Sequence, residues 1–248
     1  MSRYDRQMVL PGFGSAVQDR LSQARALVVG AGGLGCPAAG YLAGAGVNLT
    51  IVDPDVVELG NLHRQVLYAQ SQVGQQKADI AAQFVRRLNR DIAAQPIIAR
   101  LGDDEFTEAL VSGADVVLDC TDNLPTRYLL NRLCFRMRVP YVWAAIGGTA
   151  GRCSVSVDGS PCFECVSGPR PADGGSPKPV GTFGPSCGVL GSLAAGQAVL
   201  QLGGMGKSLA GRLANVDLAT GEMQVIEIAH DPACATCGHP TCNSGAKF

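Results

Sequence analysis

A glycine-rich turn that follows a short apolar run constrains this chain more than any other feature. The run Leu27-Val28-Val29 leads into Gly30-Ala31-Gly32-Gly33-Leu34-Gly35, which matches the pattern G-x-G-x-x-G. A strand that enters such a turn brings backbone amides at the start of a helix close to bound phosphates. Asp53 follows Gly30 by 23 residues, where an acidic side chain can hold ribose hydroxyls. The pattern predicts an adenine nucleotide site that uses Gly30, Gly32, Gly33, Gly35 and Asp53.

Apolar runs alternate with helical patterns over the first part of the chain. The strand-like runs are 26–29, 48–52, 94–99, 115–119 and 139–144, and helical periodicity covers 33–45, 77–89 and 124–137. This alternation predicts βαβ units with right-handed crossovers and a parallel sheet. The 32 glycines and 5% aromatic residues suit a fold with many tight strand-to-helix turns.

The pattern changes after Gly147. Residues 151–157 resemble a strand, 167–186 form a loop rich in Gly and Pro, 188–202 form an apolar helix, and 212–217 with 222–228 suit a hairpin. A loop of about 20 residues is commonly functional, and we expect it to cover the substrate. The expected fold is α/β: a Rossmann-like, mostly parallel sheet with helices on both faces, extended by C-terminal antiparallel strands. We expect one domain over 1–248, with a nucleotide-binding half at 1–146 and a second half at 147–248.

Charge and hydropathy exclude several classes of partner. The chain has 20 basic and 21 acidic residues and a formal net charge of −1, so no global field attracts nucleic acid or acidic lipid. Residues 1–14 lack the apolar core of a secretory signal, and no apolar run approaches the 18 or more residues of a membrane span. We therefore expect a cytoplasmic protein without a membrane partner, whose anionic ligand is held locally.

Residues after Asp53 separate the nucleotide hypotheses. A dinucleotide-dependent oxidoreductase shares the pattern up to Asp53, and a purely structural glycine turn is also compatible with it. An enzyme that acts on ATP must in addition neutralise a triphosphate, which requires basic side chains and a carboxylate that holds a metal ion. Arg64, Lys77 and Asp122 supply that set, although basic residues are exposed surface charges by default.

Six ordered motifs together resemble the family of MoeB, ThiF and HesA, relatives of the catalytic domain of ubiquitin-activating enzymes. The motifs are Arg3-Tyr4-Asp5-Arg6-Gln7, the glycine turn, the block from Asp53 to Gln65, Lys77, Cys120-Thr121-Asp122-Asn123, and two late C-x2-C pairs. They cover almost the whole chain. The resemblance implies an adenylyltransferase that uses ATP to activate the C-terminal glycine carboxylate of a ubiquitin-like sulfur-carrier protein, ending in Gly-Gly, as an acyl adenylate with release of pyrophosphate.

The resemblance also implies roles for individual residues. Arg64 and Lys77 surround the phosphates, Asp122 holds Mg²⁺, and Arg6 reaches the ATP of the partner subunit in a homodimer; a plain surface residue is the alternative for Arg6. The residues implied to line the nucleotide site are Gly33, Asp53, Asp55, Asn61, Arg64, Gln65, Lys77, Asp122 and Asn123. Asp122 also suits the N-cap of the helix at 124–137, since Asp is favoured there.

Cysteine spacing predicts a structural metal site. Cys162-Phe163-Glu164-Cys165 and Cys234-Ala235-Thr236-Cys237 are C-x2-C pairs, and four thiolates satisfy the tetrahedral preference of Zn²⁺. A redox role for one pair alone is the alternative. His230, His239 and Cys242 lie near the second pair, and we expect them to take no part. The zinc ion would attach the C-terminal tail to the body of the domain.

The remaining cysteines are expected to be structural. Some members of the family carry a cysteine in the crossover loop that forms a covalent intermediate with the carrier, but residues 166–186 contain none. Cys187 is the nearest candidate, and we expect it to be buried and inert, because reactive thiols need exposure and a lowered pKa. Cys36, Cys120, Cys134 and Cys153 also suit the core. Sulfur would then come from a separate protein.

Other functions stay open on the sequence alone. The carrier could serve molybdopterin or thiamine thiazole synthesis, with the former favoured. A related enzyme could instead adenylate a tRNA base or a peptide, although the near-neutral charge disfavours a large nucleic-acid footprint. A NAD-dependent oxidoreductase is disfavoured because no catalytic Tyr-Lys or His-Asp pair is evident.

Overall fold

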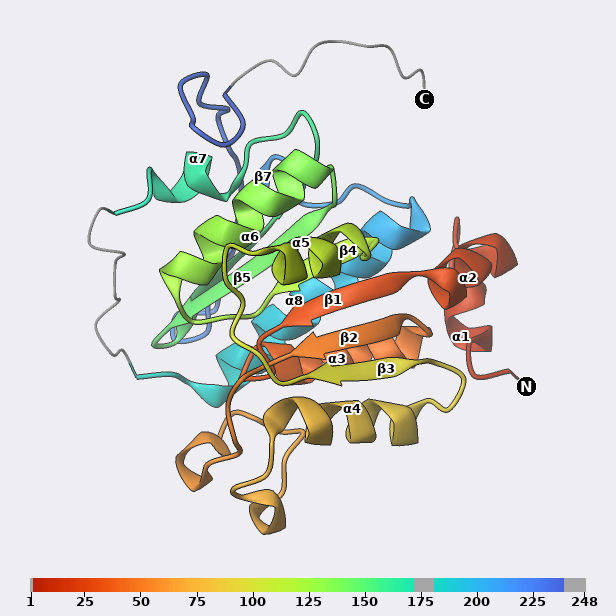
Figure 1. The fold of residues 1–248 in the computed structure, drawn as a ribbon. Coiled ribbons are helices and arrows are strands. Elements are labelled where there is room, and N and C mark those ends of the chain that lie inside the picture. The colour runs from red at the N-terminus through yellow and green to blue at the C-terminus, as the bar shows by residue number, and fades with distance from the viewer. Residues whose placement is uncertain (1, 172–180, 239–248) are drawn as a thin grey trace.

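The computed structural model describes residues 2–171 and 181–238. Its centre is an eight-stranded sheet in the order β3-β2-β1-β4-β5-β6-β7-β8 (Figure 1). The first five strands in that order are parallel, and β5 to β8 are antiparallel. The bounds of the strands are β1 Arg25–Val29, β2 Asn48–Val52, β3 Ala94–Ile97, β4 Val116–Asp119, β5 Tyr141–Gly147, β6 Ala150–Ser156, β7 Arg212–Asp217 and β8 Glu222–Glu227.

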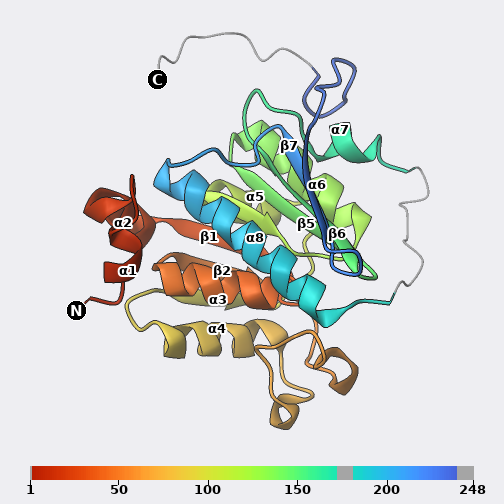
Figure 2. The same ribbon diagram turned by 180° about the vertical axis from the view of Figure 1, so that it is seen from behind.

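Helices cover both faces of the sheet. The helices α3 (Gly35–Ala45), α4 (Lys77–Leu88) and α8 (Gly184–Gly203) lie on one face, and α5 (Glu105–Ser112) and α6 (Leu124–Met137) lie on the other (Figures 1 and 2). Short elements complete the fold: α1 Asp5–Met8, α2 Gly14–Gln23, η1 Leu59–Asn61, η2 Gln70–Gln72 and α7 Phe163–Ser167. This arrangement confirms the α/β, mostly parallel sheet with a C-terminal antiparallel extension.

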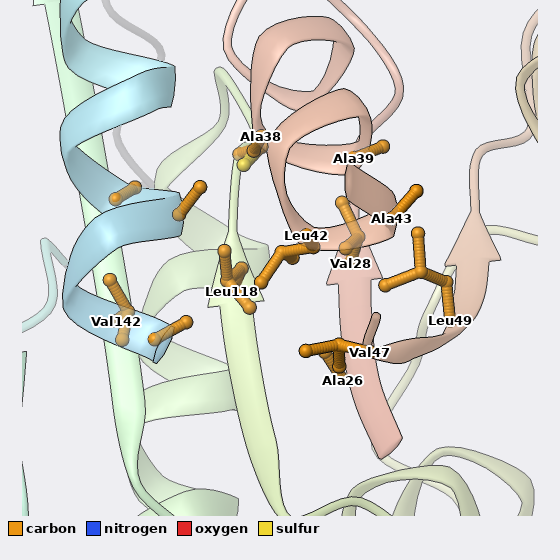
Figure 3. Packing of buried hydrophobic residues seen from close by; sticks show 14 of the residues in the cluster. Ala26, Val28, Ala38, Ala39, Leu42, Ala43, Val47, Leu49, Leu118 and Val142 are labelled. Carbon is orange, nitrogen blue, oxygen red and sulfur yellow. The ribbon is translucent and has the colours of Figure 1, made fainter. Parts of the chain in front are cut away.

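The larger core lies between the sheet and the face covered by α3 and α8. Figure 3 shows Leu42 of α3 between Val28 of β1 and Leu118 of β4, with Ala38 and Ala39 on the same helix. Small side chains on α3 let this helix pack closely on the sheet and on α8. Burial of these side chains fixes the direction in which α3 leaves the glycine turn.

Strand order places the glycine turn at a topological switch point. From β1 the chain crosses over to β2 on one side, whereas β4 lies on the other side of β1. In open α/β sheets, ligands bind outside the carboxyl ends of the strands where the strand order reverses in this way. The turn at 30–35 and the segment after β4 meet at this position.

Several boundaries and elements differ from the sequence-based expectations. Helix α8 begins at Gly184, inside the expected loop 167–186, because Pro185 occupies the first turn of the helix, where a missing N–H costs nothing. Helices α1, α2, α5 and α7 lie where the sequence analysis predicts no helix. Most of the remaining expected loop, residues 172–180, lies outside the described residues.

Candidate functional site

The glycine turn is closed against the end of β4. Gly30 has a φ of +92°, and a Cβ atom added there would lie 2.8 Å from the carbonyl oxygen of Cys120. A Cβ atom on Gly35 would lie 1.9 Å from the carbonyl oxygen of Gly30. Both contacts are with backbone, which cannot move aside as a side chain can. Gly30 and Gly35 are therefore required for the shape of the turn itself.

Gly32 and Gly33 face side chains from other elements. A Cβ atom on Gly33 would lie 2.7 Å from Cys187 Sγ of α8 and 3.4 Å from Arg64 Cδ, and one on Gly32 would lie 3.6 Å from Gln65 Nε2. The turn, the segment after β2 and the first turns of α8 thus meet at one place. The structure brings these predicted site residues together.

Asp53 holds the turn from the end of β2. Its side-chain oxygens accept hydrogen bonds from the backbone N–H groups of Ala31 at 2.7 Å and Asp55 at 2.8 Å. Burial raises the pKa of the Asp53 carboxyl, while these hydrogen bonds and the charge of Lys77 act in the opposite direction. A carboxylate accepts about four hydrogen bonds, so Asp53 retains capacity for a ligand hydroxyl.

Lys77 begins α4 and points to the same region. Its side chain is 7% exposed, and its Nζ atom lies 3.4 Å from Asp55 Oδ2, whose side chain is 59% exposed. Tyr68 joins this helix to the turn, since its hydroxyl donates to the Ala31 carbonyl at 2.6 Å. No sequence motif marks Tyr68, because its role depends on contacts between segments that are distant along the chain.

Arg64 and Asn61 form a second polar group beside the turn. Arg64 Nη2 donates to Asn61 Oδ1 at 2.9 Å, and the backbone N–H of Gln65 donates to the Asn61 carbonyl at 3.0 Å. Gln65 Oε1 is buried and has no hydrogen-bond partner among the described residues. Arg64 and Lys77 therefore offer two cations near one glycine turn, which suits a phosphate-containing ligand, and Gln65 Oε1 offers a free acceptor for a ligand hydroxyl or amino group.

Asp122 and Asn123 follow β4 at the neighbouring strand end. The expectation that Asp122 caps the next helix was wrong: Asn123 is the N-cap of α6, and its Oδ1 accepts the backbone N–H of Thr126 at 3.0 Å. The Asp122 side chain is exposed and is not used as the cap. A carboxylate oxygen that remains free is the type of ligand that Mg²⁺ prefers, so this residue fits a magnesium site.

Arg6 lies away from these residues within one chain. It is exposed on α1, and the neighbouring Tyr4 packs on Gly46, the C-cap of α3. The glycine turn lies at the opposite end of α3, a helix of 11 residues, or about 16 Å. The single chain does not bring Arg6 to the site.

Four cysteines form a compact cluster between α7 and the C-terminal segment. The Sγ atoms of Cys162, Cys165, Cys234 and Cys237 all lie within 4.8 Å of one another, with Cys162 and Cys234 at 3.6 Å and Cys165 and Cys237 at 3.3 Å. Tetrahedral Zn–S bonds of about 2.3 Å would separate the sulfurs by roughly 3.8 Å. We name these residues the cysteine cluster; its donor set and spacing fit zinc.

Side chains around the cysteine cluster hold it in place. Asn131 of α6 accepts the backbone N–H of Phe163 at 2.9 Å, and its Nδ2 lies 3.5 Å from Cys162 Sγ. Thr236 donates to Glu164 Oε2 at 2.6 Å, which joins the two C-x2-C segments. His230 Nε2 lies 3.1 Å from the carbonyl oxygen of Cys237; His239 and Cys242 are outside the described residues.

Cys187 is 1% exposed, as expected for a structural thiol. Burial raises its pKa, and the charge of Arg64 lowers it by a smaller amount. The expected core thiols Cys36, Cys120, Cys134 and Cys153 are also buried, and burial raises the pKa of Cys36 and of Cys153 to about 12. A thiol that is both buried and protonated is a poor nucleophile.

Within residues 2–171 and 181–238, no helix combines the length and apolar character that crossing a bilayer requires.

Residues 4–236 match the model of the ThiF family. The chain belongs to this family. It is 41% identical over 241 residues to the molybdopterin-synthase adenylyltransferase of Escherichia coli (strain K12), with 96% of each chain covered. It is 40% identical to the SAMP-activating enzyme E1 of Haloferax volcanii, covering 96% of this chain and 89% of that protein.

The chain is also 38% identical over 247 residues to the sulfur carrier protein adenylyltransferase of Thermus thermophilus, covering 96% of this chain and 91% of that protein. Among solved structures, that of E. coli MccB with ATP is similar to this chain with a TM-score of 0.83 and 24% identity, over 96% of this chain and 75% of that one. The structural likeness supports the fold, and the sequence likeness supports the family.

Proposed function

We propose that this chain is an ATP-dependent adenylyltransferase that activates the C-terminal glycine carboxylate of a ubiquitin-like sulfur-carrier protein. The observation that carries the proposal is the convergence of two cations, Arg64 and Lys77, on a glycine turn that Asp53 holds from behind. Its relatives across nearly the whole chain are named adenylyltransferases and an activating enzyme E1. These names favour adenylation over the oxidoreductase alternative.

The reaction forms a bond from a carboxylate oxygen of the carrier to the α-phosphorus of ATP. The bond between that phosphorus and the oxygen bridging to the β-phosphorus breaks, and pyrophosphate leaves with that electron pair. A carboxylate is already ionised and nucleophilic at pH 7, so this step needs no general base. The protein therefore contributes alignment and stabilisation of charge rather than proton transfer.

Arg64 and Lys77 stabilise the negative charge that accumulates on the phosphates. Arg64 presents a planar fork that suits two phosphate oxygens, and Lys77 presents a single charge from the first turn of α4. Removal of one such cation in a site that excludes water costs on the order of 10² to 10³ in rate, by analogy with donors that stabilise oxyanions. Asp53 and Asn123 belong to the ribose and nucleotide side of the site.

Two metal ions are part of the proposal. Asp122 would hold Mg²⁺, which would supply further positive charge to the phosphates. The cysteine cluster would hold structural Zn²⁺, since a site closed by four thiolates leaves no position for a substrate. The cluster then attaches the segment after β8 to α6 and α7, and the metal contributes to folding stability.

A homodimer and a separate sulfur donor complete the proposal. Arg6 lies about one helix length from the glycine turn of its own chain, so a partner's Arg6 would complete each site. The buried thiol of Cys187 is poorly placed for a covalent step with the carrier. We therefore assign the sulfur transfer that follows to another protein.

The molybdopterin branch is the favoured pathway. The E. coli relative that covers 96% of this chain is named molybdopterin-synthase adenylyltransferase. A carrier of thiamine thiazole synthesis is the alternative, and a tRNA base or a peptide is the alternative class of substrate. These possibilities are outcomes of one experiment.

The experiment is ATP–pyrophosphate exchange with purified protein, Mg²⁺ and each candidate carrier ending in Gly-Gly. The matched variants are Arg64→Ala at the turn and Arg132→Ala on α6, where the exposed Arg132 side chain pairs with Asp103. Exchange that requires one carrier, is lost in Arg64→Ala and persists in Arg132→Ala supports the proposal and identifies the pathway. Absence of exchange with every carrier, in a protein that still binds ATP, contradicts carrier activation and favours a peptide or tRNA substrate.

A further inference from the structure

A buried pair of charged residues, Arg127 and Asp119, contacts Thr121, the residue before Asp122. Arg127 of α6 is 4% exposed and Asp119, the last residue of β4, is 1% exposed. Their closest charged atoms, Arg127 Nη1 and Asp119 Oδ2, are 4.0 Å apart, which is too far for a strong hydrogen bond. Burial of a guanidinium is unfavourable unless its N–H groups are matched, so its other contacts decide what it does.

Arg127 uses its hydrogen bonds on backbone rather than on Asp119. Its Nη2 donates to the carbonyl of Thr121 and to the carbonyl of Ala144 in β5, the latter at 2.6 Å. One side chain thus connects the end of β4 to the neighbouring strand. The Nη1 atom has no hydrogen-bond partner among the described residues.

Asp119 holds the same residue, Thr121, from the other side. Its Oδ1 accepts the backbone N–H of Thr121 at 2.9 Å and the Thr121 hydroxyl at 2.7 Å. Its Oδ2 accepts the hydroxyl of Tyr141 at 2.6 Å. The amide, the hydroxyl and the carbonyl of Thr121 are therefore all bound by the buried pair.

Asp122 is the next residue, and Asn123 after it is fixed as the N-cap of α6. The exposed carboxylate of Asp122 is thus placed by two neighbours whose backbones are both held. Buried ion pairs are weak evidence for stability, and a well-packed apolar group often replaces them without loss. The distribution of these contacts, concentrated on Thr121, indicates a positional role instead.

We propose that Arg127, with Asp119 and Tyr141, is a positioning residue that fixes the Thr121–Asp122 backbone and so places the Asp122 carboxylate for a divalent cation bound with the nucleotide. Arg127 acts through Thr121 and does not touch the nucleotide. The inference rests on the proposed function for its meaning, but the fixed backbone is a property of the free protein.

The test compares Arg127→Lys with wild type. Lysine keeps the charge, but its shorter side chain ends in an ammonium instead of the guanidinium whose Nη2 reaches both carbonyls. Loss of partners that orient a metal ligand costs about 10- to 100-fold in metal affinity or activity. We expect the apparent Mn²⁺ affinity, measured by electron paramagnetic resonance with a non-hydrolysable ATP analogue, to fall about 10-fold, and the amides of 120–123 to exchange with deuterium faster.

Two further variants make the result specific. Arg132→Lys changes an exposed residue of the same helix and should leave both measurements unchanged. Tyr141→Phe removes one hydrogen bond to Asp119 and keeps the ring. It should lower the Mn²⁺ affinity and speed the deuterium exchange of amides 120–123, each by about 3-fold. This variant replaces Arg127→Lys if Arg127→Lys does not fold.

The outcomes separate this inference from the proposed function. The positional role is overturned if a folded Arg127→Lys protein binds Mn²⁺ as tightly as the wild type and its amides at 120–123 exchange with deuterium at the wild-type rate. Slower or faster exchange across the whole chain, with unchanged Mn²⁺ affinity, shows a purely structural role and also overturns it. Because neither measurement uses a carrier, failure of carrier-dependent pyrophosphate exchange in the wild type leaves this test intact.

Discussion

Gly33→Ala is the change for which the structure gives the sharpest expectation. The added methyl would lie 2.7 Å from Cys187 Sγ, about 0.7 Å inside the shortest ordinary contact of 3.4 Å, with Cys187 Cβ at 3.3 Å and Arg64 Cδ at 3.4 Å. Overpacking of this kind costs about 1–3 kcal/mol. For a chain of this length we expect the Tm to fall by roughly 2–12 °C.

A second substitution identifies the cause of that loss. Cys187→Ala removes the sulfur that the new methyl meets, and leaves only contacts that a small shift relieves. Alone it should cost about 1 kcal/mol, because the thiol is buried. In the double variant we expect a coupling of about 1–2 kcal/mol, so that most of the loss caused by Gly33→Ala is recovered. Nucleotide affinity should not recover, since the methyl still faces the site proposed for phosphates.

The assay is thermal unfolding of the wild type, both single variants and the double variant, with ATP affinity measured by calorimetry. Gly32→Ala is the control, because its methyl would lie at an ordinary 3.6 Å from Gln65 Nε2; it should keep its Tm and lose ATP affinity. If the double variant melts at the temperature expected from simple addition, the Cys187 contact is not the source of strain and the reasoning is refuted.

Asp53, the cysteine cluster and Arg6 each give one further testable expectation. Burial raises the pKa of the Asp53 carboxyl, so its proton stabilises the folded state, and this stabilisation is lost as the pH rises through the pKa of the folded protein. The Tm of the wild type minus that of Asp53→Asn should therefore fall as the pH is raised above about 4. A difference in Tm that does not change with pH contradicts this prediction. Chelation of zinc should release the thiols of the cysteine cluster to a thiol reagent and lower the Tm by about 10 °C; an unchanged Tm after proven metal loss opposes a structural zinc. If each site takes Arg6 from the partner subunit, an equal mixture of inactive Arg6→Ala and Arg64→Ala proteins should recover about a quarter of the wild-type rate of ATP–pyrophosphate exchange, because about half of the dimers are mixed and each has one intact site. No recovered activity, once mixed dimers are shown to form, excludes a shared site.

Local sequence signals were sufficient where the periodicity was strong. The helix expected at 124–137 is α6 with the same bounds, and the strand at 48–52 is β2, because an apolar period and flanking turn residues specify such elements. Helix α5 was missed although Asp104 accepts the backbone N–H of Thr107 as an N-cap. Pro185 was interpreted as a loop residue, whereas its ring is compatible with a first helical turn.

Some residues of the candidate site can be identified from the sequence, and others only from the fold. Glycine spacing, Asp53 and the C-x2-C pairs are visible because each depends on neighbours along the chain. Tyr68 and Asp119 were not recognised, since their partners, the Ala31 carbonyl and the Tyr141 hydroxyl, are distant in sequence. Residues that hold a site through tertiary hydrogen bonds carry no local signal, so only the fold reveals them.

Helix α6 contacts both the segment that carries Asp122 and the segment that carries the first two cysteines of the cysteine cluster. Arg127 holds Thr121, the residue before Asp122, and Asn131, four residues later, accepts the backbone N–H of Phe163 next to Cys162 of the cysteine cluster. Residues at i and i+4 lie on one face of a helix, so one helix sets the distance between the cysteine cluster and the Thr121–Asp122 segment. If the cysteine cluster holds the proposed zinc, we expect removal of the metal to break the hydrogen bond from Phe163 to Asn131 and to loosen α6, whose first turn carries Arg127.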